Sequence, residues 1–375
     1  MSINEFLEEW NSPSPYVHVQ TSGSTGTPKP MLVEKSRMLA SARRTNDFLG
    51  LQPGDTALLC MSLDFIAGKM MVVRALERHL TLVRVEPSGH PLSTQRHNGD
   101  CPLCEQRSEL QGDCPQCVAL NDQTSLSFAA MVPMQVYNSL QVPEECERLK
   151  QIKHLIIGGG AIDDDLAAEL KSFPNAVWST YGMTETLSHI ALRRLSGPDA
   201  SDWYTPFPSV TVSLSDDHCL VIDAPEVCPD RLVTNDIAEL TQGDWHLCEQ
   251  RSELHSACPL CVSFRILGRR DNTICSGGLK IQAEELERQL RPHLRVPYLI
   301  TKRPDSKFGE IVVLLTEGPV DDAREVCERI LPKYHHPRAY VHVSHIPLTA
   351  TGKPARREAE KLARESISNI LNIFI

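Results

Sequence analysis

Residues 154–186, with the sequence HLIIGGGAIDDDLAAELKSFPNAVWSTYGMTET, contain one complete β-α-β pattern. A short apolar run at His154–Ile157 is followed by three glycines. Residues Asp163–Phe173 then have helical periodicity, and a second apolar run follows at Ala176–Thr180. Strands that are connected through a helix in this way lie parallel in one sheet. The stretch therefore predicts a parallel sheet with helices packed on its faces.

The same alternation extends toward the N-terminus. Helical periodicity covers Lys35–Leu49, and Ala57–Met61 is apolar without interruption, which is typical of a strand buried on both faces. Further apolar runs of strand length are Thr56–Ser62, Leu80–Val85 and Ser125–Val132. Residues Val210–Leu214 alternate instead, as in a half-exposed strand, so the architecture changes near residue 205.

After Gly268 the pattern becomes that of a small α+β domain of roughly 100 residues. We expect a strand first, then a helix at Ala283–Leu290 and strands at Tyr298–Lys302 and Glu310–Thr316. A helix at Asp321–Ile330, a strand at Ala339–Ser344 and a terminal helix follow. The predicted fold class is α/β, with a large N-terminal α/β domain at 1–267 and a small C-terminal α+β domain at 272–375. Residues 268–271 form the junction.

Charge and hydropathy exclude several classes of protein. The 38 lysines and arginines against 48 aspartates and glutamates give a formal charge of −10, whereas a nucleic-acid-binding protein needs a basic face. The sequence has no run of 18 apolar residues, and its N-terminus lacks the basic flank and apolar stretch of a secretion signal. We expect a cytoplasmic protein without nucleic-acid or membrane partners.

A loop rich in small residues follows the predicted strand Val17–Gln20. Its sequence, Thr21-Ser22-Gly23-Ser24-Thr25-Gly26-Thr27-Pro28-Lys29-Pro30, exposes backbone N–H groups and hydroxyls beside a lysine, which suits a phosphate group. The spacing differs from that of a Walker A loop. A plain Ser/Thr/Gly linker is the alternative interpretation of the composition alone.

Thr21–Lys29 resembles the nucleotide loop of the acyl-adenylate-forming enzymes, the superfamily of acyl-CoA synthetases, luciferases and peptide-synthetase adenylation domains. Further motifs that resemble those of the family follow in its order: Gly158–Ala161, Tyr181–Thr186, Thr234–Asp236, Gly268–Asp271 and Thr351–Lys353. The resemblance runs from about residue 16 to about residue 360. The chain begins close before the nucleotide loop, so we expect the family's usual N-terminal packing and dimer surfaces to differ.

The resemblance implies the cosubstrates ATP and CoA, the cofactor Mg²⁺ and a set of site residues. The ATP-binding residues would be Thr21, Ser22, Gly23, Ser24, Thr25, Gly26, Gly159, Gly160, Tyr181, Gly182, Asp236 and Arg269. The catalytic residues would be Lys29, Thr184, Glu185 and Lys353, with Glu185 as the Mg²⁺ ligand. Charge builds up on the phosphates when a carboxylate attacks ATP, so cations are the expected contributors. Asn235 replaces a glycine of the family pattern, and it also tolerates positive φ.

The resemblance also implies a second step, in which a thiol attacks the acyl-adenylate. The small C-terminal domain would act as a lid that turns about Asp271, withdrawing Lys353 and bringing Gly277 and Gly278 to the site. A hairpin turn is the structural interpretation of the two glycines, and it is compatible with this role.

Within the superfamily, Leu63–Leu76, Ala130–Asn138 and Thr186–Ala191 are most similar to the compact o-succinylbenzoate–CoA ligases of menaquinone synthesis. A substrate with a second carboxylate needs a cation in an otherwise apolar pocket. The candidate acid-binding residues are Lys69, Arg74, Ser188 and His189. The alternative interpretation is that the Arg74 side chain extends to the surface and keeps its charge in water.

Two cysteine-rich modules interrupt the pattern, near 97–123 and 245–263, and share the sequence CEQRSEL. Cys101, Cys104, Cys114 and Cys117 have the spacing of a structural zinc site, and Cys248, Cys258 and Cys261 form a weaker counterpart. Free thiols in inserted sequence are the alternative, and the modules could also regulate the lid.

The function that we predict is ATP-dependent activation of o-succinylbenzoate as acyl-AMP and its transfer to CoA. The alternatives are adenylation of another acid for CoA or a carrier protein, and an inactive zinc-binding regulatory relative. The partners are a small acid, ATP and CoA, and a homodimer is among the assemblies that the resemblance allows.

Overall fold

A computed structural model describes residues 1–20, 30–94, 117–241, 262–349 and 353–371, without the side chains of 117–119 and 367–371. The chain forms two compact units. Unit 1 comprises Met1–Val212, Ile222–Leu232 and Thr241–Phe264, and unit 2 comprises Ser213–Val221, Val233–Leu240 and Arg265–Ile375. The α/β class that the sequence predicts is confirmed. The domain limits at 267 and 272, and the hinge at 268–271, stay predictions.

Unit 1 begins with a helix and a hairpin, followed by alternating strands and helices. The helices are α1 Ile3–Asn11, α2 Lys35–Leu49, α3 Ile66–Arg78, α4 Pro133–Leu140, α5 Pro143–Gln151 and α6 Asp164–Lys171. The strands are β1 Tyr16–Gln20, β2 Pro30–Glu34, β3 Thr56–Leu59, β4 Thr81–Arg84, β5 Cys117–Ala119, β6 Phe128–Met131, β7 His154–Ile157, β8 Ala176–Met183, β9 Ser188–Arg194 and β10 Thr205–Pro206.

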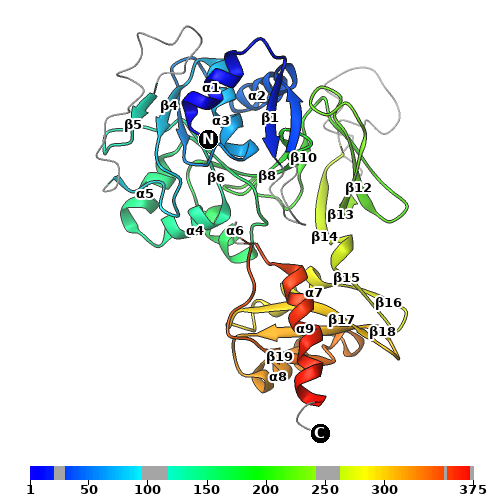
Figure 1. Cartoon of the computed structure of the whole chain (residues 1–375). Helices are drawn as coiled ribbons and strands as arrows, with labels where there is room; N and C mark the ends of the chain where they lie inside the picture. The colour runs from blue at the N-terminus through cyan, green and yellow to red at the C-terminus, as the bar shows by residue number, and fades with distance from the viewer. Residues whose placement is uncertain (21–29, 95–116, 242–261, 350–352, 372–375) are drawn as a thin grey trace. The chain divides into compact units, whose positions relative to one another are not determined.

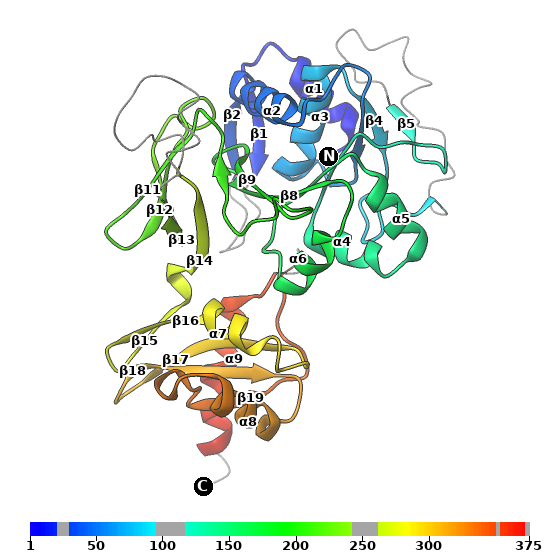
Figure 2. The same cartoon turned by 180° about the vertical axis from the view of Figure 1, so that it is seen from behind.

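An eight-stranded sheet has the order β10-β9-β8-β7-β6-β3-β4-β5. The pairs from β5 to β8 are parallel, and β9 and β10 add antiparallel strands at one edge. Figures 1 and 2 show α1, α2 and α3 on one side of this sheet and α4, α5 and α6 on the other. Ala57 and Leu58, whose side chains point to opposite faces of β3, are both fully buried, as expected for a strand covered on both faces.

The second cysteine module interrupts a pair of neighbouring strands. The strands β11 Thr211–Leu214, β12 Cys219–Asp223, β13 Leu232–Leu240 and β14 Phe264–Arg269 form a four-stranded sheet in this order. Just beyond the ends of β13 and β14, the Thr241 N–H donates to the Ser263 carbonyl at 2.8 Å. This contact brings together the two ends of the module, as expected of an insertion into a hairpin.

Unit 2 also contains the small α+β domain. Its elements are β15 Thr273–Ser276, β16 Leu279–Gln282, α7 Ala283–Leu290, β17 Tyr298–Asp305, β18 Gly309–Thr316, α8 Val320–Ile330, β19 Ala339–His342 and α9 Arg356–Leu371. Alternation along β18 explains how the sheet binds helices on both faces: Val312 and Leu314 pack in one apolar cluster with α7 and α8, and Val313 and Leu315 pack in another with α9.

Candidate active site

Three parallel strands of unit 1 end at one edge of the sheet. Met131 pairs with Ile157 and Ile157 pairs with Ser179, so β6, β7 and β8 are in register there. Directly after β7, a Cβ on Gly158 would lie 2.3 Å from Thr180 Oγ1, and Gly159 has φ +80°. Only glycine fits these conditions. In open α/β sheets, ligands bind at this carboxyl edge, and backbone can approach them closely here.

The motif from Tyr181 to Thr186 contains the last three residues of β8 and the start of the turn that leads into β9. A Cβ on Gly182 would lie 2.1 Å from the Ser188 carbonyl oxygen, at a bulge in the β8–β9 pairing. Thr186 is fully buried, accepts from the Met183 N–H at 3.0 Å and donates to the Ser188 carbonyl at 2.8 Å. The turn therefore has a rigid base, and it holds the buried Thr184 and the partly exposed Glu185.

An aromatic cluster orients Tyr181. Its ring lies edge-on to Phe264 at 5.0 Å between centroids, and Phe264 stacks on Tyr204 at 5.5 Å. Tyr204 is anchored in turn by a 2.8 Å hydrogen bond between its hydroxyl and Ser179 Oγ. Fixed aromatic rings lose little freedom when a flat ligand stacks on them, which fits the ATP-binding role predicted for Tyr181.

Glu185 has the properties of a ligand for a hard cation. Within the described residues it forms no ion pair, and it is neither fully buried nor fully exposed. Mg²⁺ in nucleotide sites is held by one or two carboxylates together with substrate phosphates, and Glu185 fits such a carboxylate. In the described part of the chain, no group of three or more His, Cys, Asp or Glu side chains could hold a metal ion by itself.

Arg74 is a buried cation that has no carboxylate partner among the described residues. Its side chain comes from α3, is 2% exposed, and donates from Nη2 to Ser188 Oγ at 2.8 Å. Its Nε has no hydrogen-bond partner among the described residues. Burial lowers the pKa of Arg74 to about 9, because the protein interior disfavours the charged form. The surface position that was the alternative for this residue does not occur.

A chain of hydrogen bonds connects Arg74 to α2. Ser188 Oγ lies 3.2 Å from His189 Nδ1, and His189 Nε2 lies 3.1 Å from Thr45 Oγ1. Thr45 donates to the Ser41 carbonyl at 3.1 Å. A neutral His189 with its proton on Nε2 satisfies every donor and acceptor in this chain. Burial, together with the charges of Arg74 and Arg44, lowers the pKa of His189 well below its ordinary value and keeps it neutral.

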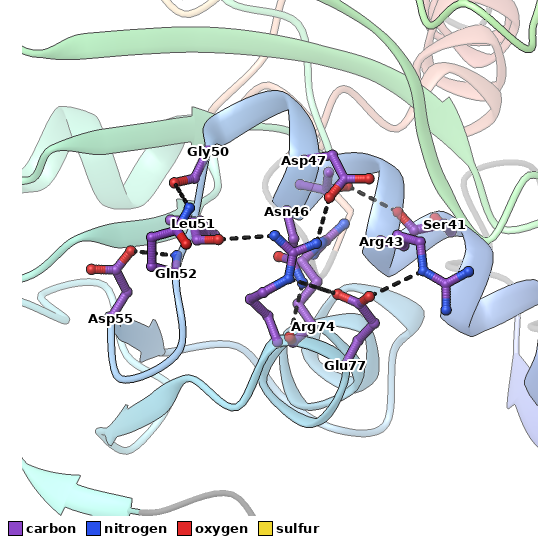
Figure 3. A network of polar contacts seen from close by, with 12 residues as sticks. Ser41, Arg43, Asn46, Asp47, Gly50, Leu51, Gln52, Asp55, Arg74 and Glu77 are labelled. Carbon is purple, nitrogen blue, oxygen red and sulfur yellow. Dashed lines mark hydrogen bonds and ion pairs between the residues drawn. The ribbon is translucent and has the colours of Figure 1, made fainter.

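The polar network in Figure 3 fixes α3 against α2. Asn46 donates to the Arg74 carbonyl at 3.0 Å and to Glu77 Oε2 at 2.8 Å. Glu77 also pairs with Arg43 and Arg78. Because Glu77 already has these cationic partners, the nearest carboxylate on the helix does not neutralise Arg74.

Of the four predicted acid-binding residues, the structure brings Arg74, Ser188 and His189 together, and Lys69 lies elsewhere. The Lys69 ammonium donates to the His18 carbonyl of β1 and lies 6.0 Å from the Phe6 ring centroid. Five residues along a helix correspond to a rotation of about 140°, so Lys69 and Arg74 leave α3 in different directions.

Sequence reasoning missed Arg44. Arg44 lies in α2, 4.9 Å from the Phe207 ring centroid, and Phe207 also lies 5.6 Å from the His189 ring. In the sequence, Arg43-Arg44 looks like a pair of surface cations. The sequence did contain one indication: Arg44 is next to Thr45, which lies on the buried face of α2 together with Leu49.

Asp236 and Arg269, which we predict to bind ATP, lie together with the predicted hinge residue Asp271 within unit 2. Arg269 Nη1 lies 3.9 Å from Asp236 Oδ1, and Arg269 Nη2 lies 3.6 Å from Asp271 Oδ2. Asn235 donates to Asp271 at 3.3 Å. Burial and the charge of Arg269 lower the pKa of Lys353, while Asp236 opposes this change. Three motifs that are far apart in the sequence thus meet in one cluster.

The turn at Gly277–Gly278 connects β15 and β16. Both residues have positive φ, +57° and +88°, which is the requirement of a type I′ hairpin turn. A Cβ on Gly278 would meet nothing within 4 Å. The conformation therefore demands glycine at both positions. The space beside Gly278 is open, whereas a Cβ on Gly277 would lie 3.2 Å from Phe308 Cδ1.

Several predicted residues lie outside the described part of the chain. They are the nucleotide-loop residues Thr21, Ser22, Gly23, Ser24, Thr25, Gly26 and Lys29, and the cysteines Cys101, Cys104, Cys114, Cys248, Cys258 and Cys261. Cys117 begins β5, but its side chain is not described. The residues that flank the nucleotide loop, Gln20 and Pro30, are paired in the β1–β2 hairpin.

A model of the AMP-binding enzyme family matches residues 6–233. The chain belongs to the AMP-binding enzymes. The 2-succinylbenzoate–CoA ligase of Enterococcus faecalis is 24% identical over 385 residues, which cover 98% of this chain and 73% of the relative. The resemblance to the adenylate-forming superfamily is thereby confirmed.

Two solved structures of AMP-binding enzymes are similar. An acyl-CoA synthetase (AMP-forming)/AMP-acid ligase II-like protein from Dyadobacter fermentans is 28% identical with a TM-score of 0.56, and the match covers 94% of this chain and 91% of that one. The o-succinylbenzoate coenzyme A synthetase of Bacillus subtilis, in complex with ATP and magnesium ion, is 20% identical with a TM-score of 0.64, covering 91% and 68%. Both have the fold of this chain.

None of the described helices is long and apolar enough to cross a membrane.

Proposed function

We propose that this AMP-binding enzyme is an ATP-dependent acid–thiol ligase that converts 2-succinylbenzoate into its acyl-adenylate and then into the CoA thioester. The observation that carries the proposal is Arg74, a buried guanidinium that faces Ser188 and has no carboxylate partner within the described residues. A buried cation without a counter-charge is costly. A substrate with a second, non-reacting carboxylate provides that counter-charge, and it suits the planar fork of arginine.

In the first half-reaction, the reacting carboxylate of the acid attacks the α-phosphorus of ATP and pyrophosphate leaves. Tyr181 stacks on adenine, Asp236 accepts from the ribose hydroxyls, and Arg74 orients the acid through its other carboxylate. Lys353 and Lys29 stabilise the charge that develops on the phosphates. Positioning and cationic stabilisation account for most of the rate in phosphate chemistry of this kind.

Glu185 would hold Mg²⁺, with Thr184 beside it against phosphate. When bound, Mg²⁺ neutralises charge on the phosphate oxygens. The fit rests on the partly exposed Glu185 carboxylate, which has no ion pair in the described chain.

In the second half-reaction, the thiol of CoA attacks the acyl carbon and AMP leaves. We propose that the Gly277–Gly278 turn serves this step, because backbone without side chains allows close approach of a long, narrow cosubstrate. Lys353 is needed for the first step and not for the second. Because ATP and CoA are cytoplasmic cosubstrates, we propose that the enzyme works in the cytoplasm.

The experiment is pyrophosphate release from MgATP across a panel of acids, with and without CoA. We expect release with 2-succinylbenzoate and formation of a thioester when CoA is added. Folded protein that releases no pyrophosphate with any acid would favour the inactive relative. Release that yields a thioester on a carrier protein, but not on free CoA, would favour the carrier-loading alternative.

A further inference from the structure

Arg44 is a second, partly buried cation close to the candidate acid-binding residues. Its Nη1 donates to Ser209 Oγ at 3.2 Å, whereas Nε and Nη2 are buried and have no hydrogen-bond partner among the described residues. Burial lowers the pKa of Arg44 to about 10, and only the exposed Glu226 opposes this change. Two of the guanidinium's nitrogens are therefore out of water and without an acceptor.

Arg44 and Arg74 belong to one continuous cluster. Arg44 lies over Phe207, and the Phe207 ring packs against His189. His189 contacts Ser188, which accepts a hydrogen bond from Arg74 Nη2. On its other side, His189 contacts Thr45 of α2, the residue next to Arg44. These contacts place both guanidinium groups near His189, and both charges lower its pKa.

The charges of this cluster do not balance. It holds two cations and a neutral imidazole, and no described carboxylate makes an ion pair with Arg44 or Arg74. Like charges that are buried together without an anion raise the free energy of the folded state. Three buried N–H groups, Arg74 Nε and Arg44 Nε and Nη2, also need acceptors. A carboxylate has two oxygens and about four lone-pair sites, which is enough for all three.

We propose that Arg44, together with Arg74, binds the non-reacting carboxylate of the acid, so that this pocket selects acids with a second carboxylate. The proposal rests on the ligase function proposed above, and it adds a specificity-determining residue. Arg44 would be a positioning residue with no part in the chemical step. Its contribution should therefore appear in the concentration of acid required and not in the maximal rate.

The test compares two acids that differ only in the second carboxylate. They are 2-succinylbenzoate and 4-oxo-4-phenylbutanoate, which lacks the ring carboxylate. Arg44→Met keeps an apolar stem against Phe207 and removes the charge. We expect its KM for 2-succinylbenzoate to rise about 10-fold or more, as for loss of a charge-assisted hydrogen bond. Its KM for the monocarboxylic acid and for ATP should change less than about 2-fold, and Arg44→Lys should recover part of the loss.

Arg43→Ala is the matched control, since it removes the same charge from the next position of the same helix. Arg43 is 63% exposed and pairs with Glu77, so its loss should change the KM for both acids alike. Thermal unfolding of the ligand-free proteins gives an independent readout. Removal of an unpaired buried charge should leave the Tm of Arg44→Met equal to or above that of the wild type, whereas a structural arginine would lower it.

Equal KM increases for both acids in Arg44→Met, or a clear fall in its Tm, would overturn the role of Arg44 and leave the ligase function intact. Absence of pyrophosphate release by the wild type with either acid would contradict the ligase function instead. Calorimetric binding of the two acids would then still test the pocket, since two cations predict a preference for the dicarboxylic acid whether or not turnover follows. Equal binding of both acids would refute that preference.

Discussion

Arg74 in α3 and Arg356 at the start of α9 are both largely enclosed arginines, but within the part of the chain that the structure describes only Arg356 has a carboxylate partner. Arg356 forms two hydrogen bonds of 2.8 Å to the two oxygens of Glu287, and a third of 2.7 Å to the Ile300 carbonyl. Burial lowers the pKa of Arg356, but Glu287 more than offsets this, so the net change is a rise. Burial alone acts on Arg74 and lowers its pKa to about 9.

The partners of a buried charge indicate whether its role is structural or is to bind a ligand. The pKa of Glu287 is raised by burial against the effect of Arg356, but the bidentate geometry indicates an ionised pair. That pair satisfies itself and needs no ligand, so its role is structural: it fixes the start of α9, three residues after Lys353. Arg74 lacks such a partner, which is the state expected of a residue that awaits a substrate anion.

The difference between the two sites is tested most directly by removing the charge of Glu287 or of Arg74 and measuring the free energy of unfolding. Glu287→Ala removes the bidentate partner of Arg356 and leaves it, among the described residues, only the longer 3.9 Å pair with Glu284. The change should lower the free energy of unfolding by about 3 kcal/mol, the lower end of the range for breaking buried pairs. Arg74→Met should leave stability unchanged or raise it. Chemical denaturation of both variants measures this. A stabilised Glu287→Ala, or an Arg74→Met that loses as much as Glu287→Ala, would remove the distinction between the two sites.

Lys353 extends the comparison to a cation for which we propose the substrate phosphate as partner. Lys353→Ala should reduce adenylation about 100- to 1000-fold, as for removal of a preorganised electrostatic contact, while thioester formation from supplied acyl-AMP stays largely intact. A bulky residue at Gly278 should do the reverse. The two half-reactions are assayed separately as pyrophosphate release and thioester formation. If both variants lost both half-reactions equally, separate roles for Lys353 and the turn would be wrong.

Arg74→Ala sharpens the assignment of the acid pocket. Loss of a charge-assisted contact is worth about 1.5–3 kcal/mol, which corresponds to a rise of roughly 10- to 150-fold in the KM for 2-succinylbenzoate. The KM for ATP should change little, because Arg74 faces the acid. Steady-state kinetics with each substrate varied in turn measures both values. Equal increases for acid and ATP would show that Arg74 supports the fold instead.

A smaller effect is expected for His189, which should make the protein less stable in mild acid. Its pKa in the folded state lies well below its ordinary value of about 6.5, so the unfolded chain takes up the proton first as the pH falls. Stability should then decrease below about pH 6.5, by up to about 1.4 kcal/mol per pH unit. His189→Gln should show a shallower decrease between pH 7.5 and 5.5 in thermal unfolding. Parallel curves for both proteins would contradict a neutral His189.

The smallest effect on catalysis is expected from the first cysteine module. If Cys101, Cys104, Cys114 and Cys117 hold a structural zinc ion, protein purified without added metal should contain about one zinc per chain. Chelation should remove it without loss of adenylation. Elemental analysis with less than about half a zinc per chain would support free thiols in inserted sequence.

Local sequence patterns determined the layout of this protein. Continuous apolar runs predicted the buried strands, and the 3.6-residue period predicted α2 and α7 with the limits that the structure gives, Lys35–Leu49 and Ala283–Leu290. These features depend on neighbours within a few residues, which the sequence contains. The family motifs likewise identified the glycine turn and the Tyr181 motif, whose backbone conformations require particular residue types.

Only the tertiary structure decided which charged side chains face an anion. Arg43 and Arg44 are adjacent in the sequence, but Arg43 is 63% exposed and pairs with Glu77, whereas Arg44 lies over Phe207, which is 163 residues away in the chain. Lys69 and Arg74 share one helix, but one donates to His18 and the other to Ser188. The energy of a charge depends on its burial and on its nearest counter-charge. Long-range packing fixes both, and no local pattern records them.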